Sequence, residues 1–185
     1  MKERLGIDRG ALRLRRGGAA DADFVREVAV QVFAQFGDYG RILPTWLVHD
    51  GVLTHVAETL AAEPARPVGF TMLGFYPSLP GPTTSDEFVA DLLAIAVAPP
   101  AQGKGVGRRL LEHAIAQVQA AARRLPIREL RLSVADTNLR ARRLFQQFHF
   151  RLVHGDHGFY DGGQLALHLA RPLDPEGGTK GATRR

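Results

Sequence analysis

The chain has 185 residues, 45% of them hydrophobic and 23% charged, which is typical of one globular domain with a hydrophobic core. The absence of cysteine excludes disulfides, thiolate metal ligands and a cysteine nucleophile, and no apolar run approaches the roughly 18 residues of a membrane span. The net charge of +5 comes from scattered Lys and Arg without interleaved aromatic residues, which argues against nucleic-acid binding. The N-terminus has no signal-like apolar stretch, so we expect a cytoplasmic protein that contacts no membrane.

The first half of the chain predicts a strand, two helices and two further strands. Alternating apolar and basic residues predict a short strand over 11–16, and helical spacing of apolar residues predicts a helix over 19–36. A shorter helix is expected over 42–51, with Trp46 in the core. Residues 54–59 and 67–76 are predicted to be two strands joined by a polar turn.

The second half begins with the Pro- and Gly-rich connector PSLPGPTTSDE. The apolar run FVADLLAIAV then predicts a central strand, buried on both faces, over 88–97. We expect later helices over 107–124 and 138–148, and later strands over 129–135, 151–154 and 164–170. The pattern predicts a three-layer α/β/α domain with a mixed central sheet over residues 1–170, followed by a flexible basic tail over 171–185.

Three glycines, Gly103, Gly105 and Gly107, alternate between the central strand and the next helix. A P-loop would need a Ser or Thr after Lys104, and a dinucleotide fingerprint would need a third glycine where Arg108 stands. Glycine permits positive φ, and consecutive N–H groups that end at a helix N-terminus form an anion site. The stretch therefore fits a pyrophosphate site, with an ordinary structural turn as the alternative.

Two motifs resemble those of the GCN5-related N-acetyltransferase (GNAT) family. The first, V-x-P-x-x-[QR]-G-x-G-x-[GA], is matched at every defined position from Val97 to Gly107. The second, N-x-x-A-x-x-L-Y-x-x-x-G-F, starts at Asn138, with Phe145 in place of its tyrosine and His149 in place of its glycine. The order of predicted elements over 11–170 also suits the fold of this family, so the resemblance covers most of the chain.

The resemblance implies transfer of an acetyl group from acetyl-CoA to a primary amine by direct attack in a ternary complex. In the family, the glycine loop holds the pyrophosphate, the preceding strand pairs with the pantetheine arm, and the asparagine of the second motif contacts the cofactor. Arg140 and Arg143 are either contacts of the ribose phosphate or solvated surface residues. The implied cofactor-binding residues are Ile95, Ala96, Val97, Gln102, Gly103, Lys104, Gly105, Val106, Gly107, Arg108, Asn138 and Phe145.

A base is expected because the attacking amine must be neutral, whereas a lysine-like amine has a pKa of about 10.4. Asp91 is our candidate, since it is the one charged residue in the apolar run over 88–97. It also lies six positions before Val97, where histone-modifying members of the family place a glutamate base. The alternative is that Asp91 sits at an exposed strand edge. Asp86 and Glu87 are weaker candidates for the base.

The proton donor to the departing thiolate is less clear from the sequence. In this family a tyrosine of the second motif often has that role, and Phe145 cannot donate a proton. Tyr160 is the candidate replacement, with Tyr39 as another, or water can serve because a thiol pKa is only about 8.5. Phe145 also favours a second hypothesis, a sensor module that binds acyl-CoA without catalysis. His149 is expected to tolerate the left-handed conformation that glycine would adopt.

No motif identifies the acceptor. We expect a small-molecule amine, with a protein N-terminus or a lysine as the alternative, and we expect the loop-rich segments 37–46 and 154–163 to contact it. The oligomeric state stays open, a homodimer included.

Neither a metal site nor a nucleophilic serine is expected. His154 and His157, with Asp156 and Asp161 nearby, lack a clear third-ligand pattern. Ser133 has no His and Asp at a recognisable spacing, so nucleophilic catalysis has no support in the sequence.

Overall fold

The computed structural model describes residues 12–78, 88–153, 155 and 157–173, so most of the predicted tail (174–185) and most of the connector lie outside the described residues. Short 3-10 helices cover Ala19–Asp21 and Pro99–Ala101. The helices are α1 (Ala22–Phe33), α2 (Tyr39–Trp46), α3 (Val106–Ala122) and α4 (Leu139–Gln147). The strands are β1 (Leu12–Arg16), β2 (Val52–Thr59), β3 (Arg66–Pro77), β4 (Phe88–Val97), β5 (Ile127–Ala135), β6 (Arg151–Leu152), β7 (Gly158–Phe159) and β8 (Leu165–Pro172).

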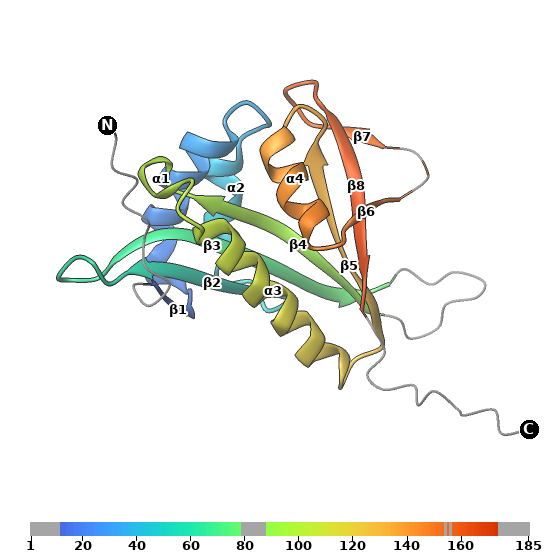
Figure 1. Cartoon of the computed structure of the whole chain (residues 1–185), viewed down its shortest axis with the longest axis horizontal. Helices are drawn as coiled ribbons and strands as arrows, with labels where there is room; N and C mark the ends of the chain where they lie inside the picture. Colours follow the sequence, from blue (N-terminus) through green and yellow to red (C-terminus); the bar gives the residue numbers. More distant parts are fainter. Residues whose placement is uncertain (1–11, 79–87, 154, 156, 174–185) are drawn as a thin grey trace, which may run out of the picture.

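The strands form one mixed sheet with helices on both faces (Figure 1). The sheet has eight strands in the order β1-β2-β3-β4-β5-β8-β6, and β7 also pairs with β8. Among the described strands, β4 and β5 form the parallel pair and the other pairs are antiparallel. This architecture confirms the predicted three-layer α/β/α fold with a mixed central sheet.

Most predicted elements are present, and their boundaries differ where turns begin. The helix expected over 19–36 starts as a 3-10 turn and is α-helical only over Ala22–Phe33. The helix expected over 42–51 is Tyr39–Trp46, because the chain leaves it through turns in which the His49 N–H donates to the Trp46 carbonyl. Strand β7, only two residues long, was not predicted, and β8 runs two residues past position 170.

The two faces of the sheet are covered unequally. On one face, α3 and α4 pack along β3, β4, β5 and β8 through residues such as Leu111, Val118 and Phe145. On the other face, α1 and α2 pack on β2, β3 and the C-terminal half of β4, with Leu43 and Phe70 fully buried there. That second cluster includes no residue of β5 or β8. The half of this face formed by β5 and β8 is therefore free to carry polar side chains.

A β-bulge at Leu93 divides β4 into two halves. Met72 of β3 pairs with Ala94 and Leu73 pairs with Leu92, so Leu93 is the extra residue. A bulge reverses the side-chain alternation, and here Leu92 packs toward α3 whereas Ala94 packs toward α1. Pairing of β4 with β5 extends from Phe88 to Asp91 and stops just before the bulge. The two parallel strands separate beyond that point, which leaves a backbone edge of β4 facing the opening.

A pair of histidines lies between β2 and α3. The ring centroids of His55 and His113 are 4.2 Å apart in an edge-on arrangement. Burial, together with His113 and Arg16, lowers the pKa of His55 from 6.5 to about 4. Burial, followed by the nearby Arg109, also lowers the pKa of His113. Both imidazoles are therefore neutral in the folded protein near neutral pH.

This pair predicts a specific pH dependence of stability. The pKa of His55 in the folded protein lies below its value in the unfolded chain. The contribution of neutral His55 to the free energy of unfolding is therefore complete above about pH 6.5 and is lost as the pH falls toward 4. We expect His55 to account for about 2 kcal/mol of the decrease in unfolding free energy between pH 7 and pH 4.5, measured by urea denaturation. His55→Gln should remove that part of the slope, whereas His49→Gln, at an exposed turn residue, should retain it. Equal slopes in the two variants would contradict the assignment.

Candidate active site

A groove in three sections follows the opening between β4 and β5. The loop cavity, of about 960 Å³, lies beside the glycine loop and α4. The cleft cavity, of about 90 Å³, lies between β4 and β5, and the polar cavity, of about 560 Å³, lies beyond it. The loop and cleft cavities share Phe36, Ile95, Asn138, Ala141 and Phe145. The cleft and polar cavities share Tyr39, Leu92, Leu93, Leu132, Ser133 and Tyr160.

The glycine loop has the backbone conformation that its sequence predicts. Gly103 and Gly105 have φ angles of 79° and 85°, a left-handed region that glycine adopts without a Cβ penalty. Gly105 is the N-cap of α3, and the first helical hydrogen bond runs from the Arg109 N–H to the Gly105 carbonyl at 3.1 Å. The amides before Arg109 therefore have no helical acceptor, and they stand at the positive end of the helix dipole. This geometry suits an anion.

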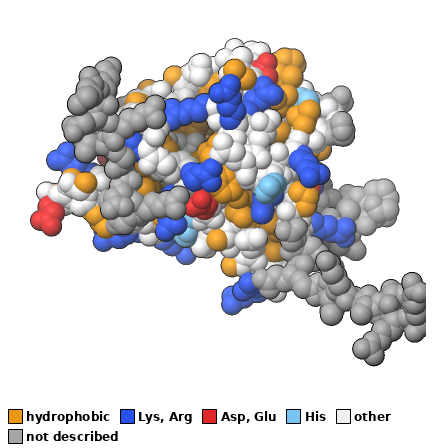
Figure 2. Space-filling model, in the orientation of Figure 1, with side chains coloured by type: hydrophobic (Ala, Val, Ile, Leu, Met, Phe, Trp, Pro, Cys, Tyr) orange, Lys and Arg blue, Asp and Glu red, His pale blue; other side chains and the backbone are white. Residues whose placement is uncertain are grey.

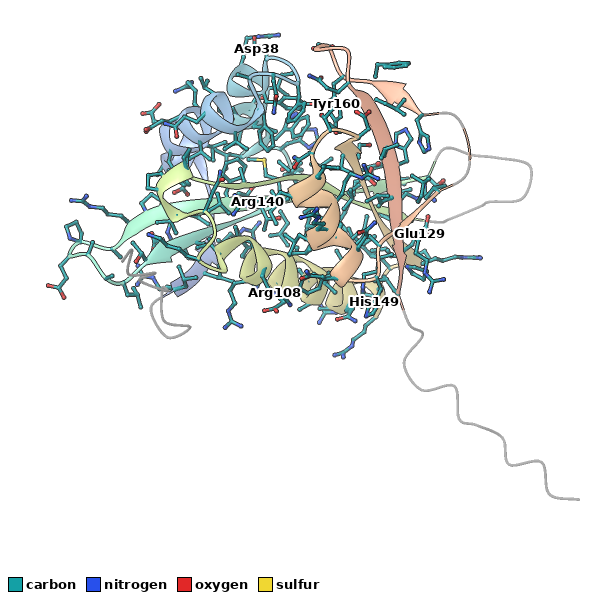
Figure 3. The ribbon with its side chains drawn as sticks, turned by 45° about the horizontal axis from the view of Figure 1, so that its top comes forward. Asp38, Arg108, Glu129, Arg140, His149 and Tyr160 are labelled. Carbon is teal, nitrogen blue, oxygen red and sulfur yellow. The ribbon has the colours of Figure 1, made fainter. Side chains whose placement is uncertain are left out.

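Side-chain contacts fix the loop to its surroundings. The Gln102 side-chain amide donates to the Val97 carbonyl at 2.9 Å, and its oxygen accepts from the Arg140 guanidinium at 2.9 Å. Arg108 donates to the Gln147 side-chain oxygen at 2.5 Å and ties α3 to α4 (Figure 3). These bonds hold the loop against both β4 and α4. Arg140 thus lies at the loop cavity, as one of the two expected arginines.

Most of the predicted cofactor-binding residues line this groove. Val106 does not, because its side chain is only 1% exposed in the core and leaves only its backbone amide for a ligand. Lys104 is exposed and also lies outside the lining. The other ten line the loop cavity, namely Ile95, Ala96, Val97, Gln102, Gly103, Gly105, Gly107, Arg108, Asn138 and Phe145.

The second motif forms the other wall of the cleft. The Asn138 side-chain oxygen caps α4 by accepting from the Ala141 N–H at 3.1 Å. Phe145 is 4% exposed, and its ring centroid lies 5.6 Å from that of Phe150. His149, just after α4, has a φ of 63°, which confirms the predicted left-handed conformation. The motif therefore shapes an apolar wall beside β4 and β5.

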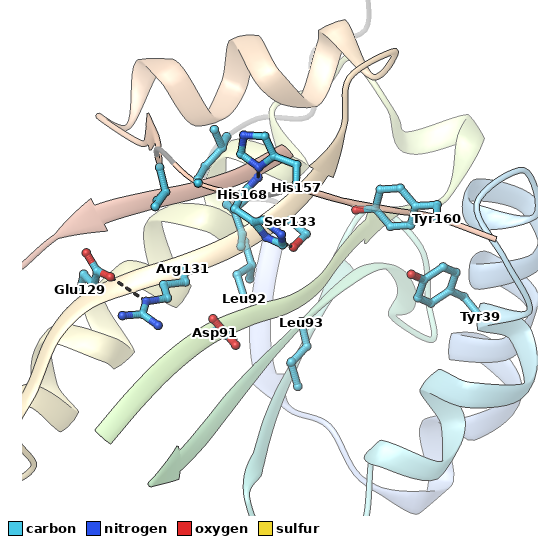
Figure 4. Close-up of a pocket in the computed structure, with 14 residues that line it drawn as sticks. Tyr39, Asp91, Leu92, Leu93, Glu129, Arg131, Ser133, His157, Tyr160 and His168 are labelled. Atoms are coloured by element: carbon cyan, nitrogen blue, oxygen red, sulfur yellow. Dashed lines mark hydrogen bonds and ion pairs between the residues drawn. The ribbon is translucent and has the colours of Figure 1, made fainter. Parts of the chain in front are cut away.

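Polar side chains gather in the polar cavity because of strand alternation on β5. Leu130 and Leu132 point to the α3 core, so Glu129, Arg131 and Ser133 point to the opposite face, which α1 and α2 leave open. Glu129 and Arg131 form an ion pair at 2.6 Å (Figure 4).

Asp91 lies at the centre of the sheet beside this cavity. It pairs with Gly74 of β3 and with Arg131 of β5, so the interpretation as an exposed strand edge is wrong. The Tyr76 hydroxyl donates to its carboxylate. Burial raises the pKa of Asp91, and the positive charges of Arg131 and His168 partly offset that effect. The carboxyl group is therefore a stronger base than an exposed aspartate.

Two tyrosines stand where the cleft and polar cavities meet. Tyr39 begins α2 and Tyr160 lies in the β7–β8 turn, so the predicted acceptor segments do come together (Figure 4). A hydrogen bond of 3.0 Å from the Gln164 side chain to the Gln35 carbonyl joins these segments. Burial, with a smaller effect of Tyr39, raises the pKa of Tyr160 to about 12. Its hydroxyl therefore stays protonated near neutral pH.

One contact in the polar cavity was missed by the sequence analysis. Ser133 Oγ lies 3.0 Å from His168 Nδ1, and the two residues are direct partners in the β5–β8 register. The spacing of residues in the sequence did not indicate this histidine partner of Ser133. The residues are 35 positions apart, and only the strand register brings them together. The backbone N–H of His168 also donates to His157 Nδ1 at 3.2 Å.

Other predicted residues lie outside the described part of the chain. These are Asp86 and Glu87, weaker candidates for the base, and His154 and Asp156 from the metal alternative. Within the described residues, no group of three or more His, Asp and Glu gathers in a metal-binding arrangement. No helix there is long and apolar enough to cross a bilayer. Lys and Arg are scattered over the face shown in Figure 2, without forming one basic stripe.

Comparison with known proteins identifies the family. The sequence profile of the acetyltransferase (GNAT) family matches residues 24–150, and the chain belongs to this family. No curated protein matches the sequence.

Solved structures share the fold at low sequence identity. Arabidopsis thaliana NAA60 in complex with a bisubstrate analogue has a TM-score of 0.74 at 15% identity, over 88% of this chain and 99% of that chain. The ribosomal-protein-S18-alanine N-acetyltransferase from Escherichia coli has a TM-score of 0.67 at 20% identity, over 91% and 97%. The IAA acetyltransferase from Bacillus cereus has a TM-score of 0.60 at 18% identity, over 88% and 100%. These similarities show the fold.

The junction of the two acceptor segments predicts the effect of a glycine substitution. A Cβ on Gly162 would overlap the Gln35 carbonyl oxygen, so Gly162→Ala must push the β7–β8 turn away from the α1–α2 connection. We expect a loss of about 2 kcal/mol, seen as a melting temperature lowered by roughly 5 °C in a thermal scan. Gly158→Ala is the matched control, because a Cβ there meets nothing within 4 Å. Equal melting temperatures of the two variants would contradict this close approach.

Proposed function

We propose that this protein transfers the acetyl group of acetyl-CoA to the primary amine of a small polar molecule, in a ternary complex. The continuity of the groove carries this proposal. An anion-binding loop at one end connects through the opening between β4 and β5 to a polar cavity at the other. Donor and acceptor can thus approach from opposite ends and meet at the shared residues Tyr39, Leu93, Ser133 and Tyr160.

The donor would occupy the loop and cleft cavities. The amides of 103–108 would bind the pyrophosphate, and Arg140 adds positive charge beside it. The edge of β4 from Leu92 to Val97 would pair with the amide groups of the pantetheine arm, because β5 has moved away from it. The apolar wall around Phe145 would exclude water from the arm.

The chemistry is a direct aminolysis of the thioester. A neutral amine forms a C–N bond to the carbonyl carbon, and the C–S bond then breaks to release the coenzyme A thiolate. N–H groups on the free edge of β4 are available to the developing oxyanion. The proton lost by the amine passes to Asp91, through water where the two are not in contact, and burial makes this carboxyl group the better base.

Tyr160 would stabilise the thiolate by a hydrogen bond. Its pKa of about 12 lies roughly three units above that of a thiol, so complete proton transfer from the phenol is uphill. Donating without full transfer still lowers the energy of the leaving group. This role replaces that of the family tyrosine, whose position Phe145 occupies.

The volume and polarity of the acceptor end favour a small polar amine over a larger ligand. A cavity of about 560 Å³ is within the usual range for small-molecule sites. Its lining includes charged side chains from β4 and β5, two histidines and two tyrosines.

Thiol release tests the activity directly. The full chain is incubated with acetyl-CoA and a panel of small primary amines, amino acids and peptides with free N-termini, and free coenzyme A is measured with a thiol reagent. We expect turnover with at least one small amine and an N-acetylated product of matching mass. Acetyl-CoA binding without turnover on any acceptor would support the sensor module instead. A preference for peptides would favour a protein N-terminus as the acceptor.

The glycine loop predicts a selective effect on the donor. Gly105→Ala places a Cβ at a φ of 85° with open space around it, so the cost is backbone strain of roughly 1–2 kcal/mol. We expect KM for acetyl-CoA to rise about tenfold, with a smaller change in kcat. Gly18→Ala, where nothing lies within 4 Å of the added Cβ and φ is −161°, should leave both constants unchanged. An unchanged KM in Gly105→Ala would contradict the assigned loop.

A further inference from the structure

We propose that His168, held by Ser133, is the first acceptor of the amine proton, and that Asp91 supplies the counter-charge for the imidazolium. This inference rests on the acetyl transfer proposed above and replaces Asp91 by His168 as the first group that takes the amine proton. It assigns a function to the Ser133–His168 pair, which neither family motif contains.

The position of the pair supports this role. Ser133 lines both the cleft and the polar cavities, whereas Asp91 lines the polar cavity alone. Asp91 pairs with Arg131 of β5, and Arg131 comes two residues before Ser133. Asp91 and Ser133 are therefore offset by about 6.6 Å along the strand direction. His168, the register partner of Ser133 on β8, lines the polar cavity beside a residue that the two cavities share.

The hydrogen bond to Ser133 engages Nδ1 of His168 and leaves Nε2 as the nitrogen that can act on the substrate. When His168 Nδ1–H donates to Ser133 Oγ, the Nε2 lone pair is left free to accept a proton. The hydroxyl thus orients the ring, as a second group does for the base in other catalytic sites, and the proposed role uses the tautomer with the proton on Nδ1. Ser133 is a positioning residue in this scheme.

Charged side chains on β4 and β5 lie near His168 on the same side of the sheet. Asp91 on β4 interacts electrostatically with His168, and its own oxygen accepts from Tyr76. Arg131 on β5 carries a positive charge, but its guanidinium is paired with Glu129 at 2.6 Å. The net charge of these three groups is negative when Asp91 is ionised.

The second histidine of the polar cavity, His157, has a backbone group rather than a hydroxyl as its hydrogen-bond partner. His157 Nδ1 accepts the backbone N–H of His168, and the two ring centroids are 5.4 Å apart. His157, like His168, lines the polar cavity and not the cleft, so it serves as a competing candidate in the test.

The reaction balances with this acceptor. The amine nitrogen forms its bond to the acetyl carbon while one N–H proton moves to His168 Nε2. The C–S bond then breaks, and the thiolate leaves with a hydrogen bond from Tyr160. The proton on His168 returns to solvent or to the thiolate, so the products are the N-acetyl amine and coenzyme A.

The experiment compares four variants with the best acceptor from the amine panel. His168→Ala should lower kcat by about a hundredfold with little change in KM for acetyl-CoA, since general bases contribute that order of magnitude. Added imidazole should restore part of the lost kcat in His168→Ala. Ser133→Ala should lower kcat by roughly tenfold, and Ser133→Thr, which keeps the hydroxyl, should recover most of it. His157→Gln is measured in parallel, and calorimetric binding of acetyl-CoA verifies that each variant is folded.

Several outcomes would overturn the proposal. They are wild-type kcat in a folded His168→Ala, loss without imidazole rescue in a variant that still binds acetyl-CoA, and a larger loss in His157→Gln than in His168→Ala. An acetyl group bound covalently to Ser133 would also overturn it, because serine would then be a nucleophile. Failure of the acetyl-transfer function itself is distinct, since the unmodified protein would then release no thiol with any amine.

Discussion

The separation of β4 from β5 after Asp91 is the constraint on which the whole site depends. A parallel pair that stayed hydrogen-bonded along its length would fill the cleft with its own backbone bonds. The bulge at Leu93 adds one residue to β4 next to the point where pairing with β5 ends. The backbone of β4 then faces an opening that joins the glycine loop to the polar cavity. Within the part of the chain that the structure describes, the groove follows from this change in strand pairing.

Incomplete coverage of the sheet explains the contrasting chemistry of the two ends. Helices α3 and α4 cover one face of β5 and β8, so alternate residues there, such as Leu132 and Leu169, are apolar. On the other face α1 and α2 stop over β4, and the remaining positions, among them Arg131, Ser133 and His168, carry polar groups. Burying these groups under a helix would cost several kcal/mol each unless they were paired. The polar cavity is thus a consequence of helix placement.

Sequence patterns predicted the features that depend on local conformation. The bounds of β4, the positive φ of Gly103 and Gly105, and the left-handed His149 all follow from residue types at neighbouring positions. The bulge at Leu93 was beyond such reasoning, because residues on both sides of it are apolar and either alternation looks the same. The Ser133–His168 contact depends on the register of β5 with β8. Register between distant strands is set by the whole fold and is not encoded in the spacing of two residues.

Because Phe145 replaces the family tyrosine, the hydroxyl that stabilises the thiolate in the proposed reaction comes from the acceptor side of the groove and not from α4. A donor on α4 would be fixed by the helix, whereas Tyr160 belongs to the β7–β8 turn, which the Gln164–Gln35 hydrogen bond joins to the α1–α2 connection. The hydroxyl that stabilises the thiolate is then positioned by the same segments that line the acceptor cavity. In the proposed reaction, the position of the group that stabilises the thiolate therefore depends on the same hydrogen bond that joins the two acceptor segments.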